Sequence, residues 1–273
     1  MQASLRIGCV KYLNDRPLIR GWGENVCLEN PAVLCAKLAA GELDVALVSS
    51  FEFLRNPVYR IVDNISISSD GPVYSVIVAH RGSISEIEEI ELDPASETSV
   101  NLLRCLLAER RLSPRLVEGG DSFGTLRTGS ATPQRPISGR AGGHPSTAQL
   151  FIGDQAIRFR RDHPEFQFWD LGEEWKKSVG LPFVYALWLI RPEILDAKTI
   201  ANRLRALRDK NLDNLDQLIA AEGEFERDFC DHYYRKHLRF SFGEREKKGL
   251  QAFQRLCAKH GLSLNGEIEF VVL

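Results

Sequence analysis

The chain lacks the long apolar runs and the excess of basic charge that membrane and nucleic-acid-binding proteins need. Its longest apolar runs, such as residues 183–190, fall far below the roughly 18 residues of a membrane-spanning helix. The 35 Lys and Arg residues are balanced by 37 Asp and Glu residues, and the net charge of −2 provides no basic field for DNA, RNA or anionic lipid. We therefore expect no nucleic-acid partner and no membrane partner.

Signals for export and for metal binding are also missing. The N-terminal residues lack the basic, apolar and small-residue blocks of a signal peptide, so we expect a cytoplasmic protein. The six cysteines form no CxxC pair and have no histidine at zinc spacing, and we interpret them as reduced, buried thiols. His232 and His237 are five residues apart, a separation that does not share one face of an α-helix. The sequence thus predicts neither a metal site nor an organic cofactor.

What the chain does contain is an alternation of strands and helices. Its 273 residues, 44% apolar and 26% charged, suffice for one large globular domain or two of moderate size. After a strand at 5–10, Asn30 and Pro31 are typical of a helix start and Gly41 of a helix end. The continuous apolar run at 45–48 indicates a strand buried on both faces, as in a parallel sheet covered by helices.

A second α/β unit is expected to begin near residue 81, after a β-branched strand at 73–79. The acidic segment 84–90 is interpreted as a solvated helical face rather than a metal cluster. The pattern of 100–111 predicts an amphipathic helix, with Thr98 or Ser99 as its N-cap.

The segment 119–147 has a different composition. It is rich in Gly, Ser, Thr, Arg and Pro without periodic apolar residues, which predicts a loop or a disordered stretch. Its composition also resembles translation in a wrong reading frame. Beyond it, we expect helices at 192–207, 212–229 and 244–260 and a final strand at 267–273.

No GxSxG, GxxxxGK[ST], HExxH or GxGxxG motif is present, so the common catalytic signatures are excluded. Instead, several predicted strands end in small hydroxyl, amide or glycine residues just before a helix. In open α/β sheets ligands bind at these carboxyl ends, where helix N-termini provide free N–H groups. The arrangement predicts a cleft for a small molecule that carries carboxylates. The strand ends are 12–14, Ser49-Ser50, 96–99 and Gly153-Asp154.

Six segments in order along the chain resemble the menaquinone-biosynthesis family whose best-known member is chorismate dehydratase. Each segment alone is weak, but six in the right order are specific. They are RIGCVKYLNDRPL, GELDVALVSSFEFL, DGPVYSVIVAHR, LDPASETSVNLLRCLL, LFIGDQAIRF and DLGEEWKKSVGLPFVYALW.

The resemblance implies an α/β fold of the type II periplasmic-binding-protein kind, with two lobes, two crossing strands and a ligand cleft between the lobes. We expect lobe one to be discontinuous, formed by residues 1–80 and 184–273. Lobe two would be 81–183, including the atypical segment 119–147. The crossings are expected near 76–80 and 182–187.

The resemblance also implies a hydro-lyase reaction, the loss of water from chorismate to give 3-[(1-carboxyvinyl)oxy]benzoate. It assigns catalytic roles to Asn14 and Ser75. An amide and a hydroxyl are not bases at neutral pH, so the base is either the enolpyruvyl carboxylate of the substrate, our leading hypothesis, or a protein group. The expected substrate-binding residues are Ser49, Ser50, Thr98, Ser99, Gly153 and Asp154.

The sequence departs from the family in one motif beside the predicted cleft. Where the family usually reads SRTS, the chain has Ser96-Glu97-Thr98-Ser99, with an acid in place of an arginine. If Thr98 and Ser99 bind a carboxylate, Glu97 must point away from it, because like charges within about 4 Å repel by roughly 1–4 kcal/mol. Two alternatives stay open beside the enzyme: a non-catalytic protein of the same fold that binds small carboxylates, and an inactive family member.

Overall fold

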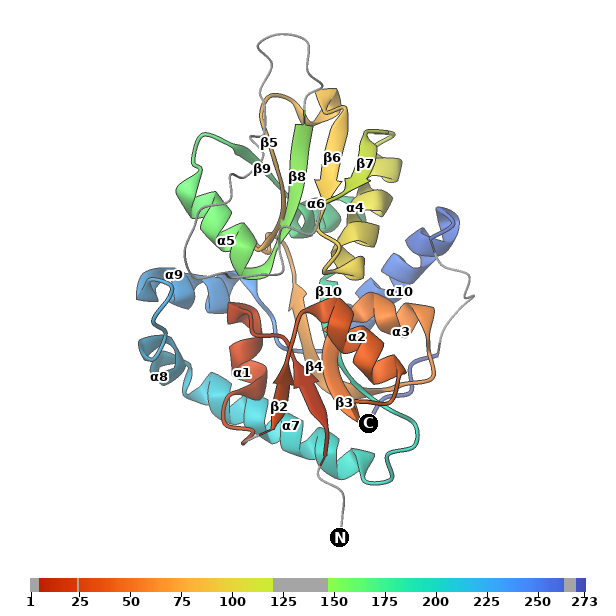
Figure 1. Cartoon of the computed structure of the whole chain (residues 1–273), viewed down its shortest axis with the longest axis vertical. Coiled ribbons are helices and arrows are strands. Elements are labelled where there is room, and N and C mark those ends of the chain that lie inside the picture. The colour runs from red at the N-terminus through yellow and green to blue at the C-terminus, as the bar shows by residue number, and fades with distance from the viewer. Residues whose placement is uncertain (1–4, 24, 120–146, 263–268) are drawn as a thin grey trace.

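A computed structural model describes residues 5–23, 25–119, 147–262 and 269–273. Two five-stranded sheets form its frame, one above the other in Figure 1. In the first sheet, β1 is parallel to β2 and β3, whereas β10 is antiparallel to β3 and β4. The strand order is β2 (Val26–Leu28), β1 (Ile7–Cys9), β3 (Val45–Ser49), β10 (Phe183–Ile190) and β4 (Arg60–Ser69).

The second sheet is mixed in the same way. Its strands β6 and β8 are parallel, and β5 is antiparallel to both β8 and β9. The order is β7 (Arg115–Glu118), β6 (Glu89–Leu92), β8 (Thr147–Ile152), β5 (Val76–His80) and β9 (Gln167–Asp170). The predicted two-sheet α/β architecture is confirmed.

The chain passes from the first sheet to the second between Ser69 and Val76, and returns at β10. Strand β5 pairs with β8 and β9 and is buried along its whole length. An apolar strand of this kind belongs in the middle of a sheet, because both of its faces need covering. The change of sheet therefore falls before β5, while the division of the chain into two lobes stays a prediction.

Helices of the first sheet begin where the local signals place them. The side chain of Asn30 accepts a hydrogen bond from the N–H of Val33 and caps α2, and Gly41 follows that helix with a φ of 76°. Only residues that tolerate a left-handed backbone fit the latter position at low cost. The elements are the 3-10 turn η1 (Leu13–Asp15), α1 (Arg16–Ile19), α2 (Pro31–Ala39) and α3 (Ser50–Arg55).

Two expectations for the second sheet are wrong. The acidic segment 84–90 is not a helical face: a short 3-10 turn η2 (Ile84–Glu86) precedes β6, where Ile90 and Leu92 are buried and Glu89 and Glu91, which alternate with them, are half-buried. This is the period-2 pattern of a strand. Helix α4 (Glu97–Glu109) is capped by Ser96, whose side chain accepts the N–H of Ser99, so the helix begins earlier than we expected.

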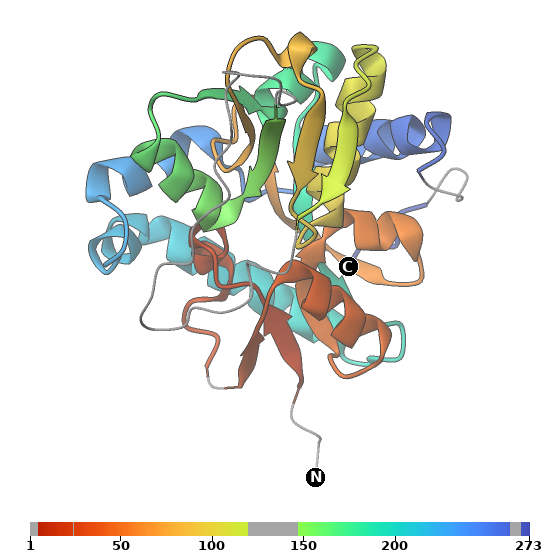
Figure 2. The ribbon, with the colours of Figure 1, turned by 45° about the horizontal axis from the view of Figure 1, so that its top comes forward.

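The remaining helices flank both sheets, with α9 on one side and α10 on the other (Figures 1 and 2). The helix expected at 192–207 begins later, and the one at 212–229 is split near Gly223. Of the final segment, Val272 forms an isolated bridge with Ile61. The helices are α5 (Gly153–Asp162), α6 (Leu171–Val179), α7 (Ala197–Asp213), α8 (Leu215–Ala220), α9 (Arg227–His232), the π-helical turn η3 (Tyr233–His237) and α10 (Glu244–Lys259).

The π-helical turn changes one of our expectations. Five-residue spacing matches its hydrogen bonding, so the rings of His232 and His237 meet with centroids 5.1 Å apart. Among the described helices, none is both long and apolar enough to cross a membrane. Residues 120–146, most of the atypical segment, lie outside the described residues.

Candidate active site

A small cavity of about 60 Å³ lies between the two sheets, at the carboxyl ends of β1, β3 and β8. Apolar side chains such as Val10, Leu47 and Ile152 form part of its wall. The polar residues of its lining are Tyr12, Asn14, Asp15, Ser49, Ser75, Ser96, Ser99 and Tyr185. Five of the residues predicted for the site therefore line it: Asn14, Ser49, Ser75, Ser99 and Gly153.

Asn14 is positioned by the η1 turn, which is held from two directions. The N–H of Leu13 donates to the Asp154 carboxylate at 2.8 Å, and the C=O of Leu13 accepts the hydroxyl of Tyr234 at 2.7 Å. The Oδ1 atom of Asn14 is buried and has no hydrogen-bond partner among the described residues. The amide is thus held in the cavity with its oxygen free for a ligand.

Ser75 lies on the other side of the cavity, at the start of β5, and is 1% exposed. The hydroxyl of Tyr233 donates to its Oγ at 2.7 Å, and its C=O accepts the N–H of Gly153 at 2.8 Å. Burial raises the pKa of Tyr233, so this phenol stays neutral and remains a donor. Because Ser75 Oγ accepts from Tyr233, its own hydrogen is available to a ligand.

The serines and the threonine at the starts of α3 and α4 contact each other across the cleft. Ser49 Oγ accepts the N–H of Thr98 at 3.1 Å and also pairs with the Thr98 hydroxyl. Thr98 Oγ1 accepts the N–H of Phe51 at 2.9 Å. Ser50 donates to the C=O of Val184 at 2.7 Å. Val184 belongs to the first sheet, so Ser50 contacts the other half through Thr98, with the two hydroxyl oxygens 3.3 Å apart. Neither Ser50 nor Thr98 lines the cavity, whereas Ser49 both lines it and contacts Thr98.

The start of α4 also places Ser96, which sequence reasoning did not assign to the site. Ser96 and Ser99 both line the cavity, with their hydroxyl oxygens 3.0 Å apart. The S-x-x-S spacing of a helix cap was the signal that could have identified Ser96. Glu97 pairs with Arg55 of α3 at 2.8 Å and is not among the residues that line the cavity.

Gly153 brings the start of α5 close to the opposite wall. Its φ is 55°, and a Cβ atom there would lie 2.9 Å from the ring of Tyr12. Any larger residue would combine backbone strain with a clash. Asp154 does not line the cavity, because its carboxylate faces Leu13. Burial raises the pKa of Asp154 to about 6.

Comparison with known proteins gives the family. The menaquinone-biosynthesis family matches residues 5–259. A curated chorismate dehydratase of Thermus thermophilus is 30% identical over 263 residues, 90% of this chain and 93% of that protein. The chain belongs to the menaquinone-biosynthesis family. The expected relationship is therefore confirmed, and it extends over both sheets.

Solved structures show which fold this family member has. A protein of Archaeoglobus fulgidus superposes with a TM-score of 0.65 at 16% identity, covering 94% of this chain and 98% of that one. The periplasmic aliphatic sulphonate binding protein of Escherichia coli gives a TM-score of 0.59 at 13% identity, covering 96% and 94%. The expected periplasmic-binding-protein fold is confirmed.

Asp15 is a further residue of the cavity that sequence reasoning did not assign to the site. It is 1% exposed, and both of its carboxyl oxygens are buried without a hydrogen-bond partner among the described residues. Burial, reinforced by the nearby Asp154, raises the pKa of Asp15 well above its usual value. No sequence signal distinguishes this aspartate, which follows Asn14 directly, from an ordinary helix cap.

No Lys or Arg is among the described residues that line the cavity. The groups that this cavity would offer to an anion are the N-termini of α4 and α5, whose dipoles are positive, and neutral donors.

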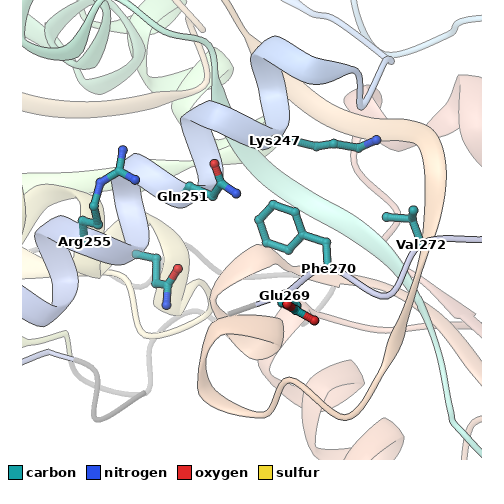
Figure 3. A pocket seen from close by; sticks show the side chains of 7 residues that line it. Lys247, Gln251, Arg255, Glu269, Phe270 and Val272 are labelled. Atoms are coloured by element: carbon teal, nitrogen blue, oxygen red, sulfur yellow. The ribbon is translucent and has the colours of Figure 1, made fainter. Parts of the chain in front are cut away.

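A wider cavity of about 540 Å³ lies between α10 and the C-terminal segment (Figure 3). Lys247, which lies at its edge, is already paired with Asp63 and Glu244. None of the residues predicted for the site lines this wider cavity. The smaller cavity between the sheets, where both halves of this family member contribute polar groups, is the candidate active site.

Proposed function

We propose that this chain is a chorismate dehydratase, which removes water from chorismate to give 3-[(1-carboxyvinyl)oxy]benzoate. The observation that carries the proposal is the 30% identity to a curated chorismate dehydratase across 90% of the chain. The cavity supports it, because Asn14 and Ser75 converge there from separate sheets.

The reaction breaks two bonds on neighbouring ring carbons. The ring hydroxyl leaves, the neighbouring carbon loses its proton, and the electron pair of that C–H bond completes an aromatic ring. Aromatisation makes the free energy of the elimination favourable. The protein therefore has three tasks: to hold the substrate, to assist the departing hydroxyl and to place a base that accepts the proton.

Asn14 and Ser75 suit the first two tasks. Both present unused hydrogen-bonding capacity to the cavity, fixed by Tyr234 acting on η1 and by Tyr233 acting on Ser75. A preorganised amide and hydroxyl stabilise charge that develops on oxygen in the transition state. We propose that the base is the enolpyruvyl carboxylate of the substrate, held against the neighbouring C–H bond.

The substrate carboxylates are proposed to bind at the starts of α4 and α5. Ser49, Ser99 and Gly153 line the cavity there and are the proposed direct contacts. Ser50, Thr98 and Asp154 are proposed to contribute indirectly, through the hydrogen bonds that hold the two halves together.

The substrate has to reach the cavity by separation of the two halves. At about 60 Å³, the cavity is far smaller than the ~300 Å³ or more of typical small-molecule sites. The contacts between Ser49 and Thr98, and between Asp154 and Leu13, bridge the halves. We therefore propose that these contacts break and re-form in each catalytic cycle. We also propose that the enzyme is cytoplasmic and needs no metal or organic cofactor.

The test is turnover of chorismate by the purified protein after treatment with a chelator. We expect an aromatic product with the ultraviolet absorbance and mass of 3-[(1-carboxyvinyl)oxy]benzoate. Restored activity only after addition of a metal would contradict the cofactor-free mechanism. Tight binding of chorismate without turnover would favour the non-catalytic binding protein, and neither binding nor turnover would indicate an inactive family member.

A further inference from the structure

Asp15 has no structural task in the fold that explains its burial. It occupies the N-cap position of α1, yet its side chain makes no capping hydrogen bond. Its neighbour Arg16 is paired with Glu222. A buried carboxyl group without a partner costs stability, and such groups are concentrated at functional sites.

The surroundings of Asp15 favour an uncharged carboxyl. The titratable groups near it are Cys9 of β1, Tyr12, Tyr233 of η3 and Asp154 of α5. Burial raises the pKa of the thiol and of both phenols, so these three stay neutral. Asp154 is the one that ionises near neutral pH, and its charge disfavours a second one on Asp15.

A neutral carboxyl in this position is a proton donor. Asp15 lines the same cavity as Asn14 and Ser75, and neither of its oxygens is used within the described part of the protein. If it were ionised, it would repel a substrate that carries two carboxylates, in a cavity whose described lining contains no cation. Protonated, it faces the substrate with an O–H group.

We propose that Asp15 is the general acid of the elimination and gives its proton to the departing ring hydroxyl. This inference rests on the proposed function. The C–O bond breaks with its electron pair going to oxygen, which takes the Asp15 proton and leaves as water. The neighbouring C–H bond gives its electron pair to the ring and its proton to the enolpyruvyl carboxylate of the substrate. That proton returns to Asp15 before the next turnover, so charge and protons balance.

The decisive variant is Asp15→Asn, which keeps the shape and a hydrogen-bond donor but cannot release a proton. We expect kcat to fall by about 10²-fold or more with KM changed by less than about threefold, since general acid–base catalysis typically contributes this much. The matched control is Asp213→Asn at the exposed end of α7, which should keep wild-type rates. Thermal unfolding of Asp15→Asn checks the fold, and we expect it to be at least as stable as the wild type.

The pH dependence of kcat separates an acid from a structural residue. An acid predicts that wild-type kcat falls as the pH rises, and that this alkaline limb disappears in Asp15→Asn. Loss of an acidic limb instead would make Asp15 a base and overturn the proposal, and identical profiles or wild-type turnover in the variant would do the same.

A measurement without substrate tests the protonation state directly. At about pH 8 Asp154 is ionised, so an infrared carbonyl band of a buried protonated carboxyl, absent from Asp15→Asn, should come from Asp15. Absence of this band in the wild type would overturn the inference while leaving the proposed function intact. A wild-type chain that binds the substrate but never turns it over would overturn the proposed function, and the acid role with it.

Discussion

The hydroxyl of Tyr233 donates to Oγ of Ser75 across 2.7 Å, and the next residue, Tyr234, donates to the C=O of Leu13 at the same distance. The π-helical turn η3 that carries both tyrosines thus supports the two proposed catalytic residues at once: Ser75 directly, and Asn14 through its neighbour in η1. Extra residues of this kind inside helices are often found at functional sites. The C-terminal helices are therefore part of the candidate site although they do not form its wall.

The proposed catalytic residues should be required for the chemical step. We expect Asn14→Ala or Ser75→Ala to reduce kcat for chorismate by about 10² or more, because a preorganised donor at a developing charge contributes about 3 kcal/mol. The folds should be retained, as judged by circular dichroism and thermal unfolding. Ser178→Ala on the exposed side of α6 is the control. Normal turnover in both site variants would overturn the assignment.

Tyr233→Phe should reveal a positioning residue. The ring is kept, the donor to Ser75 is lost, and we expect kcat to fall by about tenfold and stability by about 1 kcal/mol. Tyr59→Phe, which is also buried and is not among the residues that line the cavity or contact Ser75, is the matched control. The discriminating measurement is the double variant: in a Ser75→Ala background, Tyr233→Phe should cause little further loss of kcat. Additive losses would show that Tyr233 acts independently of Ser75.

Helix starts and ends that depend on neighbouring residues could be predicted from the sequence. The start of α2 at Asn30 and its end before Gly41 depend only on neighbouring residues, and both were predicted. Strand β4 was missed because its polar half is stabilised from far away: Ser66 donates to the C=O of Ser241, and Ser68 pairs with Arg239. Such partners cannot be found from a local pattern.

The same limit explains the candidate site. Family resemblance placed Asn14 and Ser75 at a cleft, and the structure brings both to one cavity. Thr98 was interpreted as a ligand-binding residue because it begins a helix, but its hydroxyl is occupied by Ser49 and by the N–H of Phe51. A hydroxyl at a helix start serves a ligand or another part of the chain equally well, and only the tertiary structure distinguishes the two.

Gly153→Ala adds only a methyl group, but we expect it to lower both stability and activity. The added methyl group would sit 2.9 Å from the Tyr12 ring, at a residue whose φ of 55° is unfavourable for alanine. We expect a loss of about 1–2 kcal/mol in stability and a lower kcat/KM, because Tyr12 must leave the cavity wall. Gly180→Ala is the control: its φ is 78°, but a Cβ there contacts nothing within 4 Å. Equal effects on kcat/KM would show that backbone strain alone, and not the Tyr12 contact, is responsible.

Replacement of Glu97 tests whether the departure from the SRTS motif impairs anion binding. Its side chain is 43% exposed, its Oε1 is paired with Arg55, and it is not among the residues that line the cavity. We expect Glu97→Gln to change the KM for chorismate by less than about threefold at low and at high salt, as for other exposed ion pairs. Binding that tightens tenfold at low salt, with the gain shrinking as salt rises, would show that Glu97 faces the substrate.

Asp154 should make the stability of the protein depend on pH in a direction opposite to that of most carboxylates. Its pKa is raised by burial from 3.8 to about 6 in the folded state. Between these values the folded state binds more protons than the unfolded state, so the contribution of Asp154 is complete below about pH 4 and is lost as the pH rises through about 6. A pKa difference of this size between the folded and unfolded states corresponds to about 3 kcal/mol of stability.

The variant Asp154→Asn keeps an oxygen for the N–H of Leu13 and cannot ionise. In urea unfolding, the stability of Asp154→Asn relative to the wild type should therefore increase by about 2 kcal/mol from about pH 4 to about pH 7. A difference between the two proteins that stays constant over this range would mean that Asp154 titrates normally, and that its carboxylate is more accessible to water than the closed cleft allows.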